Sequence, residues 1–247
     1  MIDLNAFVIT LRRATARKFQ VDRILANCPV ACQVVDAVDG KELSSAELDD
    51  VYQSSLHSPK YPFSLSSGEI GCFLSHRRLW QRMVDENRSQ ALIIEDDVDF
   101  EPTPFAQSLA FASEHAEPGD YVQFQVRPLV DSARMVAHQG DLRLVWPQVT
   151  PLRTSAQLVT QEAAVRLLKV TRQFDRPIDS FLQMQWLTGV RMTAMAPSNV
   201  REISQQIGGS MIGSGQPVAL MNKLRREVLR PIYRYQIASL SRRHAAA

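Results

Sequence analysis

The sequence predicts an α/β domain with a mostly parallel central sheet, and two observations lead to this fold class. Short apolar runs rich in β-branched residues alternate with longer stretches of helical periodicity along most of the chain. This alternation is typical of strands joined by helical crossovers, which run parallel. Of the 247 residues, 45% are hydrophobic, which is enough for a large core and excludes a generally disordered chain.

The amino-terminal part of the chain predicts two strands and two helices. Residues 7–11 form an apolar, β-branched run and are expected to be a strand. The basic stretch after it opens a helix from residue 12 to about residue 26. Residues 32–38 predict a second strand that ends at an Asp-Gly turn, and residues 46–51 predict a short helix.

A longer helix is expected over residues 66–86, and a buried strand follows it. Ser66 and Glu69 have the spacing of a capping box, which marks the start of the helix. Apolar residues surround most of its circumference, so the helix is expected to be buried together with His76. The continuous apolar run 91–94 is typical of a parallel strand covered on both faces.

The second half of the chain continues the alternation. We expect helices over 105–115, 161–170 and 178–188, and strands over 121–126, 142–146, 156–159 and 190–196. Residues 127–141 are expected to be mainly loop, and 207–215 a glycine-rich loop. The predicted organisation is a globular domain over residues 1–217 and a basic helical tail over 218–247.

Composition excludes several classes of protein. Three cysteines without a CxxC pair favour neither a disulfide framework nor structural zinc, and they suit a reducing compartment. The Rossmann and P-loop fingerprints are absent from the sequence. The acidic amino terminus and its short apolar stretch do not resemble an export signal, so we expect a cytoplasmic protein.

The charge is unevenly distributed. The formal net charge is +2, yet the tail from Lys223 onward carries +6, which leaves −4 on the remainder. An acidic body gives no reason to expect nucleic acid as a partner.

Three carboxylates directly follow the strand over 91–94. Glu95, Asp96 and Asp97 are expected at the carboxyl edge of the sheet, where α/β folds bind ligands. Adjacent carboxylates repel each other unless a cation neutralises them, and oxygen ligands of this kind suit Mg²⁺ or Mn²⁺. The alternative is a solvated acidic turn.

Two segments together resemble glycosyltransferase family 25. Residues 66–76 read Ser-x-Gly-Glu-Ile-Gly-Cys-x-Leu-Ser-His, and residues 91–97 read Ala-Leu-Ile-Ile-Glu-Asp-Asp. Weaker matches lie at 8–13, 36–40 and 176–179, so the resemblance extends from about Phe7 to Gly213. The family includes bacterial lipooligosaccharide β-galactosyltransferases and collagen galactosyltransferases.

The resemblance implies a GT-A-like nucleotide-diphospho-sugar transferase fold and an inverting transfer of a hexose, commonly galactose from UDP-galactose. It also implies that Glu95-Asp96-Asp97 replaces an Asp-x-Asp metal motif. Because Glu95 is one methylene longer, Asp96 and Asp97 are the expected ligands of Mn²⁺ or Mg²⁺, and Glu95 is expected to contact the nucleotide. The histidine that many GT-A enzymes supply from the C-terminal half is absent, because only His244 lies beyond His138.

The remaining donor-binding candidates come from several places in the sequence. Arg12 and Arg13 follow the first strand, where such a fold binds its nucleotide, although a solvated helix start explains them equally well. Asp39 belongs to the matched segment 36–40, and His76 ends the first long motif. Ser210 lies in the small-residue segment 208–213, whose backbone amides could close over a diphosphate or which could be a flexible linker.

The acceptor hydroxyl needs a general base on the face opposite the leaving group. Asp179, in the Arg-Pro-Ile-Asp segment, is the first candidate, and Glu69 is the second. An alternative role for Asp179 is to stabilise the amino-terminal end of its helix, or to contact the metal or the acceptor.

The tail places Leu224, Val228, Ile232, Tyr235 and Ser239 at helical spacing among arginines. A basic amphipathic helix can lie on anionic lipid, which would suit an enzyme whose acceptor is a lipid-linked or oligosaccharide component of lipopolysaccharide. A solvated helix or a dimer contact are the alternatives. Two rival functions for the whole chain are a metal-dependent nucleotidyltransferase or phosphodiesterase, and a non-catalytic glycan-binding relative.

Overall fold

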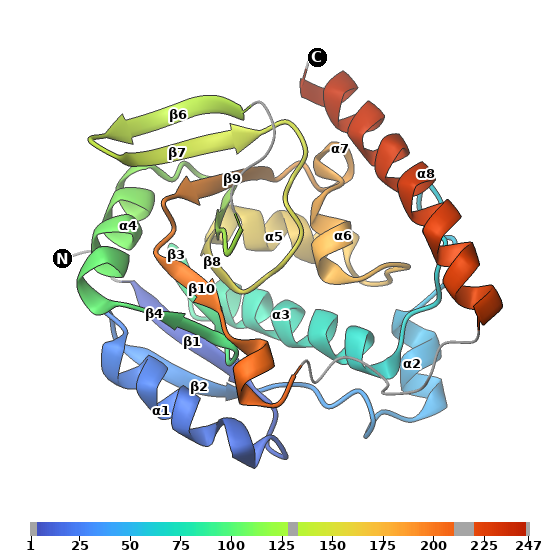
Figure 1. Ribbon diagram of the computed structural model, residues 1–247, viewed down its shortest axis with the longest axis horizontal. Coiled ribbons are helices and arrows are strands. Elements are labelled where there is room, and N and C mark those ends of the chain that lie inside the picture. Colours follow the sequence, from blue (N-terminus) through green and yellow to red (C-terminus); the bar gives the residue numbers. More distant parts are fainter. Residues whose placement is uncertain (1–3, 128–132, 210–219, 246–247) are drawn as a thin grey trace.

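The computed structural model describes residues 4–127, 133–209 and 220–245, with side chains of the last segment described from residue 226. Its centre is an eight-stranded mixed sheet. In spatial order the strands are β2 (Cys32–Asp36), β1 (Asn5–Thr10), β3 (Gln90–Glu95), β8 (Ala156–Thr160), β5 (Asp120–Phe124), β9 (Arg191–Ala196), β7 (Leu142–Pro147) and β6 (Ala133–Gln139). Only β8 and β7 run against the other strands, so the expected mostly parallel α/β fold is confirmed (Figure 1). A second, two-stranded sheet pairs β4 (Val98–Phe100) with β10 (Val200–Glu202).

Helices cover both faces of the large sheet. They are α1 (Lys18–Asn27), α2 (Ser45–Val51), α3 (Ser67–Asp85), α4 (Pro102–His115), α5 (Gln161–Val170), α6 (Ile178–Leu182), α7 (Gln185–Thr188) and α8 (Leu220–Ala245), with single 3-10 turns at Thr15–Arg17 and Ser204–Ile207. Alternate residues of β1 point to opposite faces, as the two-residue repeat of a strand requires. Phe7 and Ile9 join the core beneath α3 and α5, whereas Ala6 and Val8 join the core beneath α1 and α4.

Three expected elements differ from those in the structure. The helix expected from residue 12 begins at Lys18, after a 3-10 turn. The helix expected over 178–188 divides into α6 and α7 because the backbone of Met184 leaves the helical region. Residues 133–139, expected to be loop, form β6, an exposed edge strand whose apolar run is limited to Met135, Val136 and Ala137.

Helix α3 lies unusually close to the loop that follows β2. A Cβ atom on Gly40 would lie 1.7 Å from the carbonyl oxygen of Ser67, and one on Gly71 would lie 2.5 Å from that of Val38. The Val38 amide also donates a hydrogen bond to Ser75 Oγ over 2.8 Å. Glycine is required at both positions because only its backbone permits this approach. The Ser66–Glu69 capping box is present and starts the helix at this contact, as expected.

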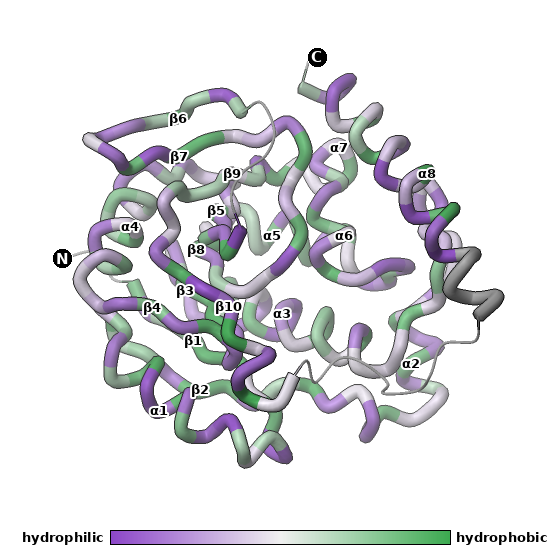
Figure 2. Tube along the Cα trace, in the orientation of Figure 1, coloured by the Kyte–Doolittle hydropathy of each residue, from purple (hydrophilic) through white to green (hydrophobic). Residues whose placement is uncertain are grey.

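Helix α8 runs along one side of the molecule, next to α7 (Figure 1). Tyr233, Ile237 and Ser241 form its buried face. The stripe expected to be apolar lies on another side, where Val228, Ile232 and Tyr235 are half or more exposed. Hydrophilic residues occur along much of the helix (Figure 2). The tail is therefore a helix, as expected, and residues outside that stripe attach it to the body.

A buried cation secures α8. Arg176 is fully buried, pairs with Asp175 over 2.7 Å and donates to Tyr233 Oη over 2.9 Å. It also donates to the carbonyl oxygens of His57 and Pro59, over 3.2 and 2.9 Å. One guanidinium thus joins the segment before α6, the 57–59 loop and α8.

Within the described residues, no helix is both long enough and apolar enough to cross a membrane.

Candidate functional site

Two hollows meet at the carboxyl end of β3. The first, which we call the β1 hollow, has a volume of about 90 Å³ and lies between the ends of β1 and β2 and the first turns of α3. The second, the α8 cavity, has a volume of about 830 Å³ and lies beneath α8 and beside α6. Cys72, Glu95 and Asp97 line both hollows. A group bound between these three side chains would be reachable from either side.

The three adjacent carboxylates have different surroundings. Asp96 is buried and accepts hydrogen bonds from Arg17 and from Thr10 Oγ1, the latter over 2.7 Å. Glu95 accepts a hydrogen bond from Thr154 Oγ1 over 2.6 Å and lies 3.4 Å from His76 Nε2. Asp96 is therefore held by a cation of the protein, whereas Glu95 and Asp97 line the meeting point of the hollows.

Asp97 carries an incompletely balanced charge. Burial, together with the negative charge of Glu95, raises the pKa of Asp97 to about 7, and Arg17 opposes this effect. The nearest nitrogen of Arg17 is 3.9 Å from Asp97 and is engaged mainly with Asp96. A pair of carboxylates in this state favours binding of a cation.

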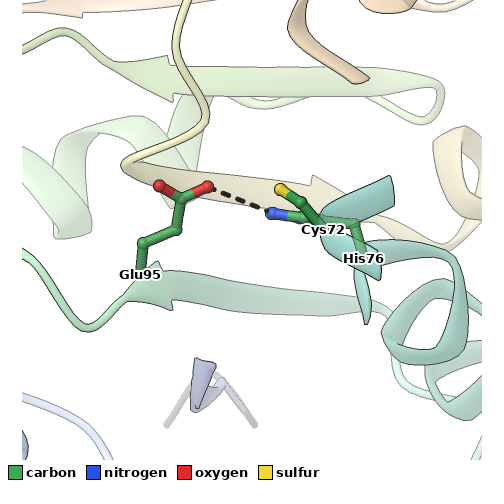
Figure 3. A group of neighbouring side chains, drawn as sticks. All are labelled: Cys72, His76 and Glu95. Atoms are coloured by element: carbon green, nitrogen blue, oxygen red, sulfur yellow. Dashed lines mark hydrogen bonds and ion pairs between the residues drawn. The ribbon is translucent and has the colours of Figure 1, made fainter. Parts of the chain in front are cut away.

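Helix α3 adds two more potential ligands beside Glu95. Cys72 and His76 are one helical turn apart, and Figure 3 shows both directed toward the Glu95 carboxylate. Their ligand atoms lie within 4.8 Å of one another. Burial raises the pKa of the Cys72 thiol, so the sulfur is protonated and is a poor ligand for a hard cation. His76 is nearly inaccessible and orients Glu95 from behind.

The expected donor-binding residues separate into three groups. Arg13, Asp39, His76 and Glu95 all line the β1 hollow, and Arg13 pairs there with Asp39. Arg12 pairs instead with Asp36 on the surface, where its side chain is 85% exposed, and it lines neither hollow. Ser210 lies outside the described residues.

Both candidates for the general base line the α8 cavity. Burial raises the pKa of Asp179, against the effect of hydrogen bonds from the backbone amides of Ser180 and Arg153. Glu69 Oε2 accepts from the amide and hydroxyl of Ser66 in the capping box, over 2.7 and 2.9 Å. Burial shifts the pKa of Asp179 upward, which strengthens it as a base, whereas Glu69 already has a structural role in the capping box.

Sequence reasoning missed several residues of the site. Arg17 belonged to a basic run without a visible period, and Thr154 carried no motif. The wall of the α8 cavity includes Tyr61 and Phe63 from the loop before α3 and Arg230 and Arg234 from α8. The only signal for this wall was the basic composition of the tail, because the residues are far apart in sequence.

Comparison with known proteins identifies a family whose model covers most of the site residues described above. The family model described as "Glycosyltransferase family 25 (LPS biosynthesis protein)" matches residues 3–182. A "Glycosyltransferase 25 family member" of Drosophila melanogaster is 28% identical over 193 residues, which are 73% of this chain and 30% of that protein. Human "Procollagen galactosyltransferase 2" is 39% identical over 98 residues, or 38% of this chain and 16% of that protein.

Two further similarities complete the comparison. The mouse "Inactive glycosyltransferase 25 family member 3" is 38% identical over 99 residues, or 39% of this chain and 17% of that protein. The solved structure of mannose-1-phosphate geranyltransferase from Thermus thermophilus covers 78% of this chain and 73% of its own, with 12% identity and a TM-score of 0.39. The chain spans about a third or less of the length of these curated relatives.

Proposed function

Because the chain belongs to glycosyltransferase family 25, we propose that it is an inverting, metal-dependent glycosyltransferase. It moves a hexose, galactose from UDP-galactose, onto a lipopolysaccharide or related surface-glycan acceptor. The observation that carries this proposal is the position of Glu95 and Asp97 at the junction of two hollows. A group-transfer enzyme needs two binding sites that meet at the reacting bond. The names of the matched family and of its procollagen galactosyltransferase members support the sugar and the acceptor class.

The β1 hollow is the proposed nucleotide site. It opens at the carboxyl ends of β1, β2 and β3, which are adjacent parallel strands, and ligands of α/β folds bind at such edges. Arg13 and Asp39 are available there to contact the donor, and His76 lies behind Glu95 and orients it.

The residues present fit a divalent cation. Glu95 and Asp97 offer carboxylate oxygens, and the raised pKa of Asp97 reflects charge that a cation would neutralise. The Arg17 contact makes Asp96 a positioning residue, so we propose Glu95 and Asp97 as the ligands of Mn²⁺ or Mg²⁺. When bound, the metal would supply positive charge to the departing diphosphate.

Asp179 is the proposed general base. It accepts the proton of the acceptor hydroxyl, whose oxygen forms a bond to the anomeric carbon as the bond from that carbon to the UDP oxygen breaks. The electron pair of the broken bond leaves with UDP, and attack from the opposite face inverts the anomeric configuration. The other cavity walls hold the acceptor and exclude water from this displacement.

We also propose contact with a membrane on the outer side of α8. Val228, Ile232 and Tyr235 are 56%, 50% and 70% exposed, and Arg242 and Arg243 are exposed farther along the helix. Apolar side chains beside cations suit the surface of an anionic bilayer, which fits a cytoplasmic enzyme with a lipid-linked acceptor. Replacing the three apolar residues with serine should reduce co-sedimentation with phosphatidylglycerol vesicles. Unchanged co-sedimentation would refute this contact.

The central experiment is a screen of nucleotide sugars with Mn²⁺ or Mg²⁺ that scores release of UDP or GDP. Release of UDP from UDP-galactose, lost in EDTA and in Asp97→Asn, is the expected result. Release of a sugar phosphate or of a nucleoside monophosphate would instead indicate the nucleotidyltransferase or phosphodiesterase class. An absence of both turnover and metal-dependent UDP binding would indicate a non-catalytic relative, a class suggested by the inactive family member in mouse.

A further inference from the structure

The α8 cavity has walls of opposite charge. Glu69, Glu95, Asp97 and Asp179 lie on the side formed by α3, β3 and α6, whereas Arg230 and Arg234 lie on the side formed by α8. Tyr61 also lines the cavity, and the charges of Glu69, Asp179 and Arg230 all act on the pKa of its hydroxyl. A molecule that fills the cavity therefore meets carboxylates on one wall and guanidinium groups on the other.

The two arginines have no carboxylate partner of their own among the described residues. None of the ion pairs found there includes Arg230 or Arg234. By contrast, Arg153 lines the same cavity and is neutralised by Glu202 over 2.8 Å. Arg230 and Arg234 therefore leave positive charge directed at the cavity.

Aromatic rings support this basic wall. The guanidinium carbon of Arg230 lies 5.9 Å from the centre of the Phe63 ring, which limits where the side chain can go. Tyr61 contacts Phe63 and Tyr233 edge-on, with ring centres 5.6 and 5.3 Å apart. Apolar faces of sugar rings pack on surfaces of this kind, and arginine binds carboxylates and phosphates through paired hydrogen bonds.

We propose that the α8 cavity binds an acidic saccharide, with its carboxylate or phosphate group on Arg230 and Arg234. This inference rests on the proposed function in that the saccharide is the acceptor, and it adds the charge of that acceptor. The cavity volume of about 830 Å³ lies in the upper part of the ~300–1,000 Å³ range of small-molecule sites, so it has room for more than one sugar unit. The anionic group then lies on a different unit from the hydroxyl that faces Asp179.

The test compares three soluble probes on one scaffold: lactose, 3′-sialyllactose with a carboxylate, and lactose 1-phosphate. Affinities are measured on the full chain by calorimetry or ligand-observed NMR without any donor. We expect at least one acidic probe to bind about tenfold or more tightly than lactose, and its identity distinguishes carboxylate from phosphate. Equal affinity for all three probes would overturn the proposal.

Variants locate the preference. Arg230→Gln/Arg234→Gln should abolish it, whereas Arg242→Gln/Arg243→Gln removes the same charge from the end of the helix and should leave it intact. Equal loss of the preference for the acidic probe in both variants would indicate a general electrostatic attraction to the helix and would contradict the proposal. Loss of phosphatidylglycerol vesicle binding in the first variant, without any preference among the sugars, would assign the wall to lipid instead.

These measurements separate the inference from the proposed function. If no nucleotide sugar is turned over but the acidic probe is preferred through Arg230 and Arg234, the proposed activity fails and the binding site stands. If UDP is released normally but lactose binds as well as the acidic probes, the activity stands and the inference fails.

Discussion

The β1 hollow and the α8 cavity share Glu95 and Asp97 but are built differently. The β1 hollow is formed by the ends of neighbouring strands and one helix, so its shape follows from the pairing of the sheet. The α8 cavity takes its walls from segments as distant as Tyr61, Arg153, Asp179 and Arg234. One half of the site is therefore set by strand order, whereas the other half depends on long-range contacts that can be weakened separately.

The largest expected effect is a loss of turnover without a loss of donor binding. Asp179→Asn should lower kcat by about 10²–10⁴-fold, because an amide cannot accept the acceptor's proton. Metal-dependent UDP binding in the β1 hollow should be unchanged when measured by calorimetry. Glu69→Gln is the matched control and should keep most of the activity; a reversal of the two results would make Glu69 the base.

The pH profile gives an independent reading of Asp179. Its carboxylate must be ionised to act as a base, so activity is lost as the pH falls through its pKa. Because burial raises that pKa, the acidic limb of kcat should lie above the ~4 expected of an exposed aspartate. A profile flat down to the range of an ordinary aspartate would contradict the assignment.

The next effect concerns Arg176, which attaches α8 above the α8 cavity. Arg176→Met leaves Asp175 buried without its partner and removes the bond to Tyr233, so it should lower the free energy of unfolding by ~3–5 kcal/mol. Urea unfolding measures this change. Arg166→Met removes a half-exposed arginine that pairs with Glu162 and should cost ~1 kcal/mol or less. Equal losses of unfolding free energy in the two variants would mean that Arg176 does not hold α8 in place.

The buried charge of Asp97 should favour metal binding and lower the stability of the metal-free protein. The pKa of an aspartate is ~4 in the unfolded chain, and that of Asp97 is about 7 in the folded protein. The negative charge of Asp97 therefore lowers the free energy of unfolding increasingly from pH ~4 to about 7, and the full loss is reached above that range. In EDTA at pH 8, Asp97→Asn should therefore stabilise the protein by roughly 2–4 kcal/mol in thermal unfolding. The gain should shrink as the pH falls toward ~4. If Asp97→Asn were less stable than the unchanged protein at pH 8, the claim that the charge of Asp97 is incompletely balanced would be wrong.

The weakest effect tests the β1 hollow alone. Gly40→Ala forces a Cβ against the Ser67 carbonyl and should cost ~1–3 kcal/mol while weakening UDP binding. Gly140→Ala, at a turn with open space around it, is the control and should leave UDP binding intact. Binding of acidic sugars in the α8 cavity should be unaffected by either change, and weakened sugar binding in Gly40→Ala would show that the two hollows are coupled.

Strong local patterns predicted much of this fold and part of this site. The capping box, the glycine-containing motif of α3 and the apolar run of β3 indicated the elements that place Glu95 and Asp97 correctly at a sheet edge. Arg13, Asp39 and His76 were also expected near a donor site, and they line one hollow. The β6 strand was missed because an exposed edge strand needs few apolar residues, and the apolar run of β6 is only three residues long.

Local periodicity was enough to indicate the α/β class and the acidic motif after a buried strand, and the motifs at residues 66–76 and 91–97 carried the resemblance to the family. Tertiary packing was needed to show which carboxylate is neutralised by Arg17 and which two line both hollows. Packing also sets the attachment of α8 through Tyr233 and Ile237, which turns Arg230 and Arg234 toward the cavity. Helical spacing shows which residues share a face, but the neighbour of that face is fixed by contacts between segments far apart in the chain.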